Sequence, residues 1–430
     1  MKQIQTVLLG YGNRGGIYAD HALDYPDEMR IIAVIEINPV RLAEAKKRYS
    51  LPENMAFSDL DEFLKSNIKA DLVINAVMDE MHYITAMKII TAGYKNLLLE
   101  KPITSDKKEL LEIRDAANAC SCNVFVGHVL RYTPFYSLIK KLIEKGEIGE
   151  IYTIEMDEHV CLHHFVDSYI RGKWHNEKEC GSPLLLSKCC HDTDLMCWFN
   201  SGSNPKNVYS AGSQSKFKKE NKPNGATEFC LDCPYVDECP YSAKKIHLEF
   251  DCMPFQTWEK IKKPYKEISD KEKIEFLKHD NYGRCVYNAG CDLVDRQSLV
   301  VEYENGSIAT FTVVGGVSKG ERYISIAGER GEIKGYFEQG IVNLYKFAID
   351  GNKKYTYKIT PLDVNSEIVT NEFGGHGGGD FALIRDVLRF INGERDNLSI
   401  TNINDSVKGH LIVYAAEESR KNGKRIGLEN

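Results

Sequence analysis

Residues 7–16, VLLGYGNRGG, place a short apolar run directly before the pattern G-x-G-x-x-G. A strand that leads into this turn and then into a helix is the arrangement that binds a dinucleotide. Gly10 permits the tight turn, Gly12 lets a pyrophosphate approach the main chain, and Gly15 lets the helix pack closely. The free N–H groups at the start of the helix would bind the phosphates. We predict cofactor contacts from Gly10, Tyr11, Gly12, Asn13, Arg14 and Gly15.

A second apolar run, RIIAVIE, ends at Glu36, about twenty residues beyond the glycines. An acid at this place accepts hydrogen bonds from the hydroxyls of the adenosine ribose, and its charge repels a 2′-phosphate. Ile37 offers no cation to offset that repulsion, although Arg41 lies nearby. We therefore expect NAD as the cofactor in preference to NADP.

The length and composition indicate a globular protein with more than one domain. A chain of 430 residues is too long for one ordinary core, and 43% hydrophobic with 10% aromatic residues argues against disorder. The net charge of −7 gives no electrostatic reason to expect nucleic acid. No apolar run is long enough to cross a bilayer, and the first residues begin a strand rather than a secretion signal. We expect a cytoplasmic protein without a membrane or nucleic-acid partner, whose thirteen cysteines are reduced thiols or metal ligands.

The pattern of elements divides the chain in two. Strand and helix patterns alternate over residues 1–126, which predicts an α/β Rossmann domain with a doubly wound, mostly parallel sheet. Alternating runs around Asn305-Gly306 and beyond predict that 127–430 form an α+β domain with a large, mainly antiparallel open sheet. Residues 201–292 are polar, rich in lysine and irregular, and are predicted to be an insertion.

Polar residues stand at the carboxyl ends of the predicted parallel strands, where ligands of such folds bind. One strand ends at Asn75 and Ala76, and the next ends in Glu100-Lys101-Pro102. A lysine in this position is expected to face the cofactor crevice. We predict further cofactor contacts from Asn75, Ala76, His82, Glu100 and Lys101.

A later helix crowds ionisable groups together. His191 lies one turn past Ser187 and Lys188, so these polar groups point the same way. Such crowding indicates a functional site, and we assign catalytic roles to Lys101, Lys188 and His191. A glycine-rich loop at 374–379 would allow close approach of a ligand. The predicted substrate contacts are His128, Arg131, Tyr132, Trp174, Asp192, His376 and Asp380.

The insertion contains Cys230, Cys233 and Cys239 in the spacing C-x2-C-x5-C. Three thiols could hold zinc with one more ligand, or an iron–sulfur cluster with one more cysteine. The fourth ligand is left open among Cys252, Cys285, Cys291 and His247. Unmetallated thiols are the alternative.

Taken together, GYGNRGG with Glu36, the Glu100-Lys101-Pro102 end, GHVLRYTP at 127–134, the His191 helix and the C-terminal sheet resemble the Gfo/Idh/MocA oxidoreductase family. The resemblance covers nearly the whole chain apart from the insertion. It implies a Rossmann domain followed by an α/β domain, with NAD(P) in the crevice and hydride transfer at a carbon of a sugar or polyol. It also implies homodimers or homotetramers built through the open sheet.

In this family the lysine of E-K-P lies beside the reacting hydroxyl, and a histidine one turn after an aspartate completes the acid–base set. Lys101 and His191 match, but Ser187 stands where the aspartate is expected, and Lys188 is the replacement that we predict. Lys101 would be the base or its electrostatic support, with His191 as partner. Tyr132 and Trp174 would stack on a sugar face.

Three hypotheses of function follow. The first is an NAD-dependent oxidoreductase that acts on a secondary hydroxyl or ketone of a sugar, glycoside or inositol. The second is a glycoside hydrolase that oxidises the sugar, eliminates the aglycone and reduces the product again with the same NAD. The third is a regulator that senses NAD or a metal without turnover.

Overall fold

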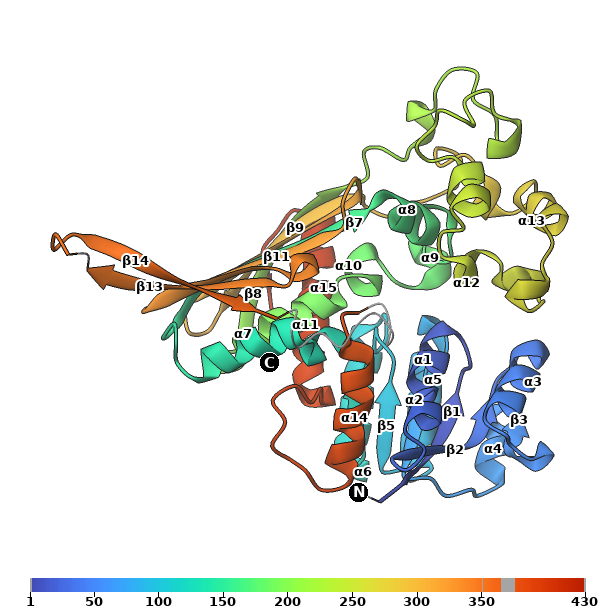
Figure 1. Ribbon diagram of the computed structural model, residues 1–430, viewed down its shortest axis with the longest axis horizontal. Helices are drawn as coiled ribbons and strands as arrows, with labels where there is room; N and C mark the ends of the chain where they lie inside the picture. Colours follow the sequence, from blue (N-terminus) through green and yellow to red (C-terminus); the bar gives the residue numbers. More distant parts are fainter. Residues whose placement is uncertain (1, 350, 365–375, 429–430) are drawn as a thin grey trace.

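The computed structural model describes residues 2–349, 351–364 and 376–428, and it contains two sheets that confirm the predicted fold class (Figure 1). A six-stranded parallel sheet has the order β3-β2-β1-β4-β5-β6. A nine-stranded sheet has the order β14-β13-β12-β11-β7-β10-β9-β8-β15, and within it only β7 and β10 pair in parallel. The second sheet is therefore mixed and mainly antiparallel.

The parallel sheet is doubly wound and has a hydrophobic core on each face. Its strands direct alternate side chains into these two cores. Val7 and Leu9 pack on one face of the sheet, whereas Leu8 packs on the other. Its strands are β1 (Ile4–Leu9), β2 (Met29–Ile35), β3 (Ala56–Phe57), β4 (Leu72–Asn75), β5 (Asn96–Leu99) and β6 (Asn123–Val126). The helices of this part are α1 (Asn13–Ala19), α2 (His21–Asp24), α3 (Pro39–Arg48), α4 (Leu60–Lys65), α5 (His82–Thr91) and α6 (Lys107–Cys120).

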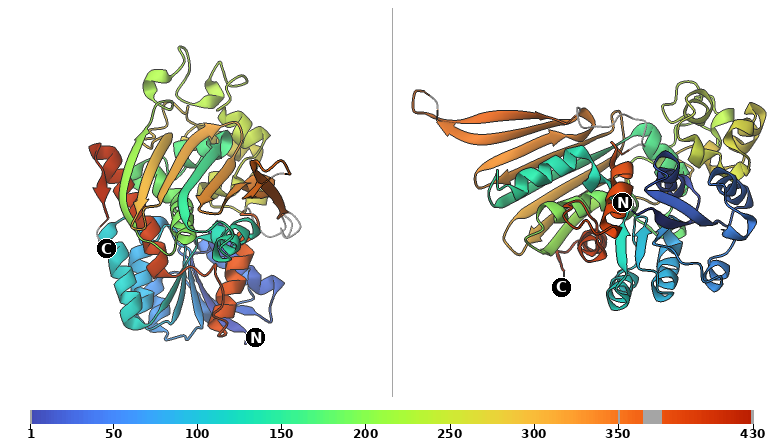
Figure 2. Two further views of the ribbon diagram at one scale, coloured as in Figure 1. Left: turned by 90° about the vertical axis from the view of Figure 1, so that its left-hand side faces the viewer. Right: turned by 60° about the horizontal axis from the view of Figure 1, so that its bottom comes forward.

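The nine-stranded sheet begins with the long strand β7 and has helices on one face (Figure 2). Its strands are β7 (Ile151–Cys161), β8 (Pro205–Ser213), β9 (Arg296–Tyr303), β10 (Ile308–Val317), β11 (Glu321–Gly328), β12 (Gly331–Tyr336), β13 (Ile341–Ile349), β14 (Tyr355–Asp363) and β15 (Ile426–Gly427). The predicted hairpin at Asn305-Gly306 joins β9 to β10, and Gly306 has a φ of +86°. A positive φ at this place is the reason that a tight hairpin selects glycine.

The helices that follow β6 pack mainly on the nine-stranded sheet, but the last two of them reach the parallel sheet. These helices are α7 (Pro134–Glu144), α8 (Leu162–Phe165), α9 (Glu177–Cys180), α10 (Leu184–Ser187), α11 (Cys190–Phe199), α14 (Gly379–Ile391) and α15 (Ile403–Asn422). Leu383 and Val387 of α14 belong to a core of the parallel sheet, although they lie late in the chain. In α15, Val407 packs on the parallel sheet while Ile412 packs on the nine-stranded sheet. Residues near the end of the chain, in α14 and α15, therefore pack against the parallel sheet of the first domain.

The insertion is shorter and better ordered than predicted. Residues 205–213 form β8, which pairs with β9, so the insertion begins only after this strand. Val208 is the one strongly apolar residue of β8 that is fully buried, which is why the alternation is weak in the sequence. The rest contains α12 (Pro254–Thr257), α13 (Asp270–Leu277) and a small core of Trp258, Ile268, Leu277 and Tyr282.

Candidate active site

The glycine turn between β1 and α1 has the shape that a dinucleotide requires. A Cβ atom at Gly10 would lie 2.7 Å from the Ala76 carbonyl oxygen, and one at Gly15 would lie 1.9 Å from the Gly10 oxygen. A Cβ atom at Gly12 would have no neighbour within 4 Å. Packing therefore requires two of the glycines, and the third leaves the main chain open to a ligand, as a pyrophosphate needs. Asn13 is exposed at the start of α1.

Glu36 lies directly after β2, beside this turn, and is only 4% exposed. Its carboxylate accepts hydrogen bonds from the N–H groups of Tyr11 and Asn38, each at 2.8 Å. Arg41 donates to the same carboxylate at 3.0 Å and also pairs with Glu259 of the insertion. The predicted ribose acid thus has a cation beside it, and the insertion reaches this end of the crevice.

Arg14, Glu100 and Asp380 form a buried network that joins α1, the end of β5 and α14. Arg14 Nε lies 2.7 Å from Glu100 Oε1, and Arg14 Nη2 lies 2.5 Å from Asp380 Oδ1. Burial alone would raise the pKa of Glu100, but the charges of Arg14 and Lys101 hold it below its ordinary value. The structure therefore brings these predicted residues together as one ion-pair network, with His376 beside Asp380 at 3.0 Å.

Asn75 is the last residue of β4, and His82 is the first residue of α5. The Asn75 Nδ2 atom donates to Thr85 at 2.7 Å, while its buried Oδ1 has no hydrogen-bond partner in the described chain. The ring nitrogens of His82 lie 2.5 Å from the Pro102 oxygen and 3.2 Å from the Val77 oxygen. Since both face main-chain carbonyls, His82 ties two loops together and presents no free nitrogen to a cofactor.

Lys101 reaches from the parallel sheet to the second domain. Its Nζ atom donates a hydrogen bond to the main-chain oxygen of Ser187 at 2.8 Å, where α10 ends. His191 follows on α11 and is 5% exposed. Burial, together with the charge of Lys101, lowers the pKa of His191 well below its ordinary value. The ring is therefore neutral at neutral pH, and its buried Nδ1 atom has no partner in the described chain.

Lys188 faces a charged cluster on the nine-stranded sheet. Its Nζ atom lies 3.1 Å from Glu158 on β7. Arg322 on β11 lies 2.5 Å from Glu158 and 3.3 Å from Asp192. Burial raises the pKa of Asp192 to about 7, and Glu158 adds to this effect, although both cations oppose it. Asp192 therefore titrates near neutral pH beside the predicted catalytic residues.

Sequence reasoning missed Glu158 and Arg322. In β7 the inward positions are Ile154, Met156, Glu158 and Val160, so an acid among apolar residues was the signal available. His164 on α8 is surrounded by cations: burial and the charge of Lys188 lower its pKa well below its ordinary value. The ring of His376 lies 6.1 Å from that of His191, which extends this cluster of imidazoles.

Three predicted substrate contacts support the fold beneath the site. Arg131 is 2% exposed and donates two hydrogen bonds of 2.6 Å to Asp194. His128 Nδ1 lies 2.9 Å from the same carboxylate. The Tyr132 hydroxyl pairs with Thr401 at 3.0 Å. Because the Arg131 guanidinium and the Tyr132 hydroxyl are buried against protein partners, the stacking of Tyr132 on a sugar at this site is not supported.

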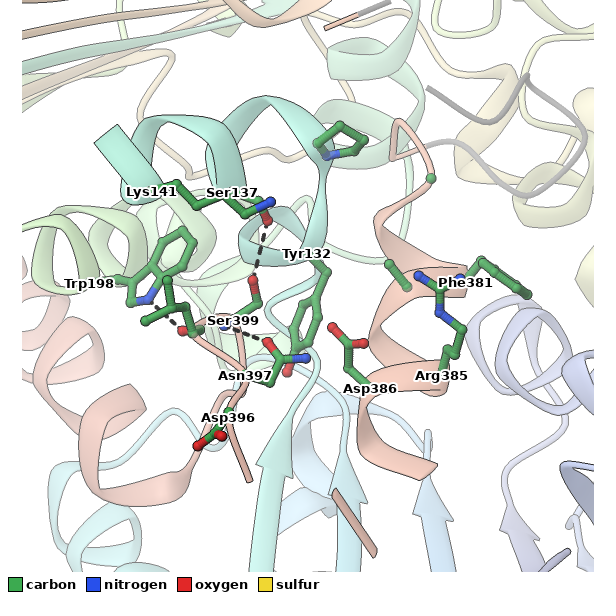
Figure 3. A pocket seen from close by; sticks show the side chains of 14 residues that line it. Tyr132, Ser137, Lys141, Trp198, Phe381, Arg385, Asp386, Asp396, Asn397 and Ser399 are labelled. Carbon is green, nitrogen blue, oxygen red and sulfur yellow. Dashed lines mark hydrogen bonds between the residues drawn. The ribbon is translucent and has the colours of Figure 1, made fainter. Parts of the chain in front are cut away.

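The ring of Tyr132 instead lines a separate pocket of about 430 Å³ between α7, α14 and residues 396–399 (Figure 3). Trp198, Phe381 and Asp386 also line it. The residues lining this pocket do not include Lys101, Lys188 or His191, so it is distinct from the acid–base cluster.

Trp174 lies at the boundary between the domains. Its Nε1 atom donates to Asp79 at 3.1 Å, and Lys173 Nζ stands 4.3 Å from the centre of the indole ring. Asp79 belongs to the loop after β4, so this tryptophan joins the second domain to the Rossmann domain.

All thirteen cysteines are free thiols. Within the described ranges, no three side chains of His, Cys, Asp or Glu form a group that could hold one metal ion. The predicted zinc ligands Cys230, Cys233 and Cys239 are therefore not arranged as a mononuclear site. None of the described helices is both long and apolar enough to cross a membrane.

Comparison with known families covers both domains. Residues 4–128 match "Oxidoreductase family, NAD-binding Rossmann fold", and residues 140–428 match "Oxidoreductase family, C-terminal alpha/beta domain". The chain belongs to the Gfo/Idh/MocA oxidoreductase family. The family resemblance read from the motifs is thus confirmed, and with it an oxidoreductase that has an NAD-binding domain.

Individual relatives are distant. The chain is similar to the oxidoreductase YteT of Bacillus subtilis, at 24% identity over 83% of this chain and 81% of that protein. It is 26% identical to an inositol 2-dehydrogenase of Corynebacterium glutamicum over 46% of this chain, and the match spans about half of that protein, 54%. A levoglucosan dehydrogenase in complex with NADH and levoglucosan has the same fold, with a TM-score of 0.69 and 16% identity over the whole of both chains.

Proposed function

We propose that this oxidoreductase is an NAD-dependent dehydrogenase that acts on a secondary hydroxyl or ketone of a sugar, glycoside or inositol. The observation that carries the proposal is the contact from Lys101 to Ser187, which brings the lysine of the Rossmann domain to the helix pair that bears His191. The inositol dehydrogenase and the levoglucosan dehydrogenase among its relatives support a carbohydrate or polyol substrate.

The residues around the glycine turn fit the cofactor. NAD, when bound, supplies the nicotinamide carbon that accepts the hydride. Gly12 offers open main chain, Asn75 offers an unpartnered buried oxygen, and Glu36 lies where a ribose is expected. We propose that Gly10, Tyr11, Gly12, Asn13, Gly15, Glu36, Asn75, Ala76, Glu100 and Lys101 hold the cofactor, with Arg14 positioning Glu100.

Removal of a hydroxyl proton must accompany hydride loss from the same carbon. The His191 ring is neutral, so we propose that it accepts this proton. The Lys101 ammonium would stabilise the negative charge that develops on the oxygen. Lys188 pairs with Glu158 at 3.1 Å, and we propose that Lys188 takes the role of the aspartate that the family has where this chain has Ser187.

A redox glycosidase is the second candidate, because His376 places another imidazole beside His191. Elimination of an aglycone needs a second base at the neighbouring carbon, and His376 would provide it. The experiment measures NADH formation and sugar release across free pyranoses, inositols and aryl glycosides. Steady NADH formation supports the dehydrogenase, whereas sugar release at constant NADH supports the glycosidase. Binding of NAD without turnover of any of these compounds would contradict both and favour a regulator.

The open face of the nine-stranded sheet supports a homodimer or homotetramer. Tyr209, Val300 and Ile308 are exposed on the neighbouring strands β8, β9 and β10, each at least 38%. Contiguous apolar surface of this kind marks an interface. We also propose a cytoplasmic location, because thirteen free thiols are typical of a reducing compartment.

A further inference from the structure

A fourth cysteine, Cys285, lies beside the three cysteines of the insertion motif. Phe229 and Arg284 form an antiparallel bridge, and the Cys285 N–H group donates to the Glu228 oxygen at 2.9 Å. The Cys230 Sγ atom lies 3.7 Å from the Arg284 oxygen. Arg284 directly precedes Cys285 and lies 54 residues after Cys230 in the chain. The fold therefore places Cys230 and Cys285 on adjacent segments that are distant in sequence.

The other two cysteines return to the same place through tight turns. The Cys233 N–H group donates to the Cys230 oxygen at 3.1 Å, and the Cys239 N–H group donates to the Tyr235 oxygen at 2.8 Å. The Cys239 and Cys285 thiols each have a backbone hydrogen bond two residues further on, at Tyr241 and at Tyr287. Arg171, which contacts Cys230, also donates to the Tyr241 oxygen, so the Cys239 turn is held beside the Cys230 turn.

Arg171 is a buried cation that contacts all three segments. It is 2% exposed, and its Nη2 atom lies 3.2 Å from Cys230 Sγ and 2.7 Å from the Tyr241 oxygen. Its Nε atom donates to the Arg284 oxygen at 2.7 Å. Its Nη1 atom is buried and has no hydrogen-bond partner in the described chain. The guanidinium therefore holds the bridge and the Cys230 turn together.

No carboxylate of the described residues lies within ion-pair distance of Arg171. Asp167 is the acid on the same helical turn, and burial raises its pKa to about 7, so it does not supply a full negative charge at neutral pH. A buried cation is costly unless an anion is close. Neutral thiols leave this charge uncompensated, whereas thiolates bound to a metal would compensate it.

We propose that Cys230, Cys233, Cys239 and Cys285 are the four thiolate ligands of a metal centre, with Arg171 as its buried counter-charge. Each thiol releases its proton when the metal binds, because the thiolate is the ligand form. Four thiolates around a doubly charged centre leave net negative charge, which the guanidinium meets. The C-x2-C spacing is found in both zinc and iron–sulfur sites.

The spacing of the thiols bears on the kind of metal. In the described ranges these cysteines do not form a group that could hold one metal ion. In a four-iron cluster each cysteine binds a different iron atom, so the ligand sulfurs lie farther apart than around one zinc ion. Metal analysis must therefore distinguish iron with sulfide from zinc.

The other candidates for the fourth ligand face elsewhere. Cys291 Sγ donates to the Tyr169 oxygen at 3.3 Å. His247 Nδ1 lies 3.2 Å from the Thr257 hydroxyl. Cys291 is therefore a matched control, since it comes from the same insertion and is also largely buried.

The experiment is metal and sulfide analysis of the full chain purified without oxygen. We expect stoichiometric metal, either iron with acid-labile sulfide and a visible absorption band or zinc without them, and either outcome supports the four-thiolate site. Cys285→Ser should lose the metal, and Cys291→Ser should keep it. Arg171→Gln should keep the ligands but lower the metal affinity about 10- to 100-fold, as loss of a supporting contact does.

Two results would overturn the proposal. One is wild-type protein that carries no zinc or iron and binds neither Zn²⁺ nor iron with sulfide when these are added. The other is Cys285→Ser protein with the metal content of the wild type. If Cys285→Ser does not fold, thiol titration of native wild type decides: four thiols should become reactive only when a chelator removes the metal, and unchanged reactivity refutes the site.

Discussion

The Nζ atom of Lys101 donates a hydrogen bond across the domain boundary to the main-chain oxygen of Ser187, 2.8 Å away. The Ser187 hydroxyl turns back to the Pro183 oxygen at 3.0 Å, so this short side chain does not meet the ammonium. An ammonium has three donors, and in the described chain Lys101 uses one of them. Two donors therefore remain for a substrate oxygen.

Lys101→Met tests the role of this ammonium. Methionine has similar length without the charge, so we expect kcat/KM to fall about 10²- to 10⁴-fold, whereas NAD should still bind because the glycine turn and Glu36 are unchanged. Steady-state rates and a fluorescence titration with NAD measure the two effects. Lys95→Met is the control, because Lys95 is an exposed lysine of the same domain. Near-normal turnover of Lys101→Met would remove Lys101 from the mechanism.

Asp192→Asn tests the pKa of about 7 that burial gives this carboxyl. An ordinary aspartate in the unfolded chain releases its proton near pH 4. The folded protein therefore holds an extra proton between about pH 4 and pH 7, and this carboxyl's contribution to stability falls as the pH rises through that window. The difference in stability between Asp192→Asn and the wild type should therefore favour the variant more at pH 8 than at pH 5. Urea unfolding at the two pH values would measure this difference. A difference that is independent of pH would contradict the raised pKa.

Much of the fold was predictable from local patterns, because β1, β2, β4 and β5 are compact apolar runs, and three of them end at or directly before Glu36, Asn75 and Glu100. Lys101 and His191 were predictable because their motifs fix their places at a strand end and on a helix. Glu158 and Arg322 were not, since their meeting depends on the pairing of β7 with β11, which are more than 150 residues apart in the chain. Arg131 was misread because its buried partner Asp194 lies on a helix that no local pattern relates to it.

Glu259→Gln tests whether the insertion sets the choice of cofactor. In the structure Glu259 and Glu36 both pair with the guanidinium of Arg41. These two carboxylates neutralise the positive charge of Arg41, which would otherwise attract a 2′-phosphate. Loss of one carboxylate should raise the NADP to NAD ratio of kcat/KM about tenfold, which corresponds to about 1.4 kcal/mol. Initial rates with both cofactors measure this ratio, and Glu267→Gln is the control within the insertion. An unchanged ratio would show that Arg41 stays with Glu36 alone.

Arg131→Met tests the buried support of the site. The change removes a fully buried guanidinium and leaves the Asp194 carboxylate with the His128 ring as its neighbour. Breaking a buried ion pair on one side costs about 3–5 kcal/mol, so we expect a clear fall in the denaturant midpoint. Arg114→Met removes an exposed pair with Asp115 and should cost no more than about 1 kcal/mol. The double change Arg131→Met with Asp194→Leu should recover part of the loss, because no unpaired carboxylate then remains in the core. If the double variant is less stable than Arg131→Met, the loss of stability in Arg131→Met comes from altered packing and not from the unpaired Asp194 charge.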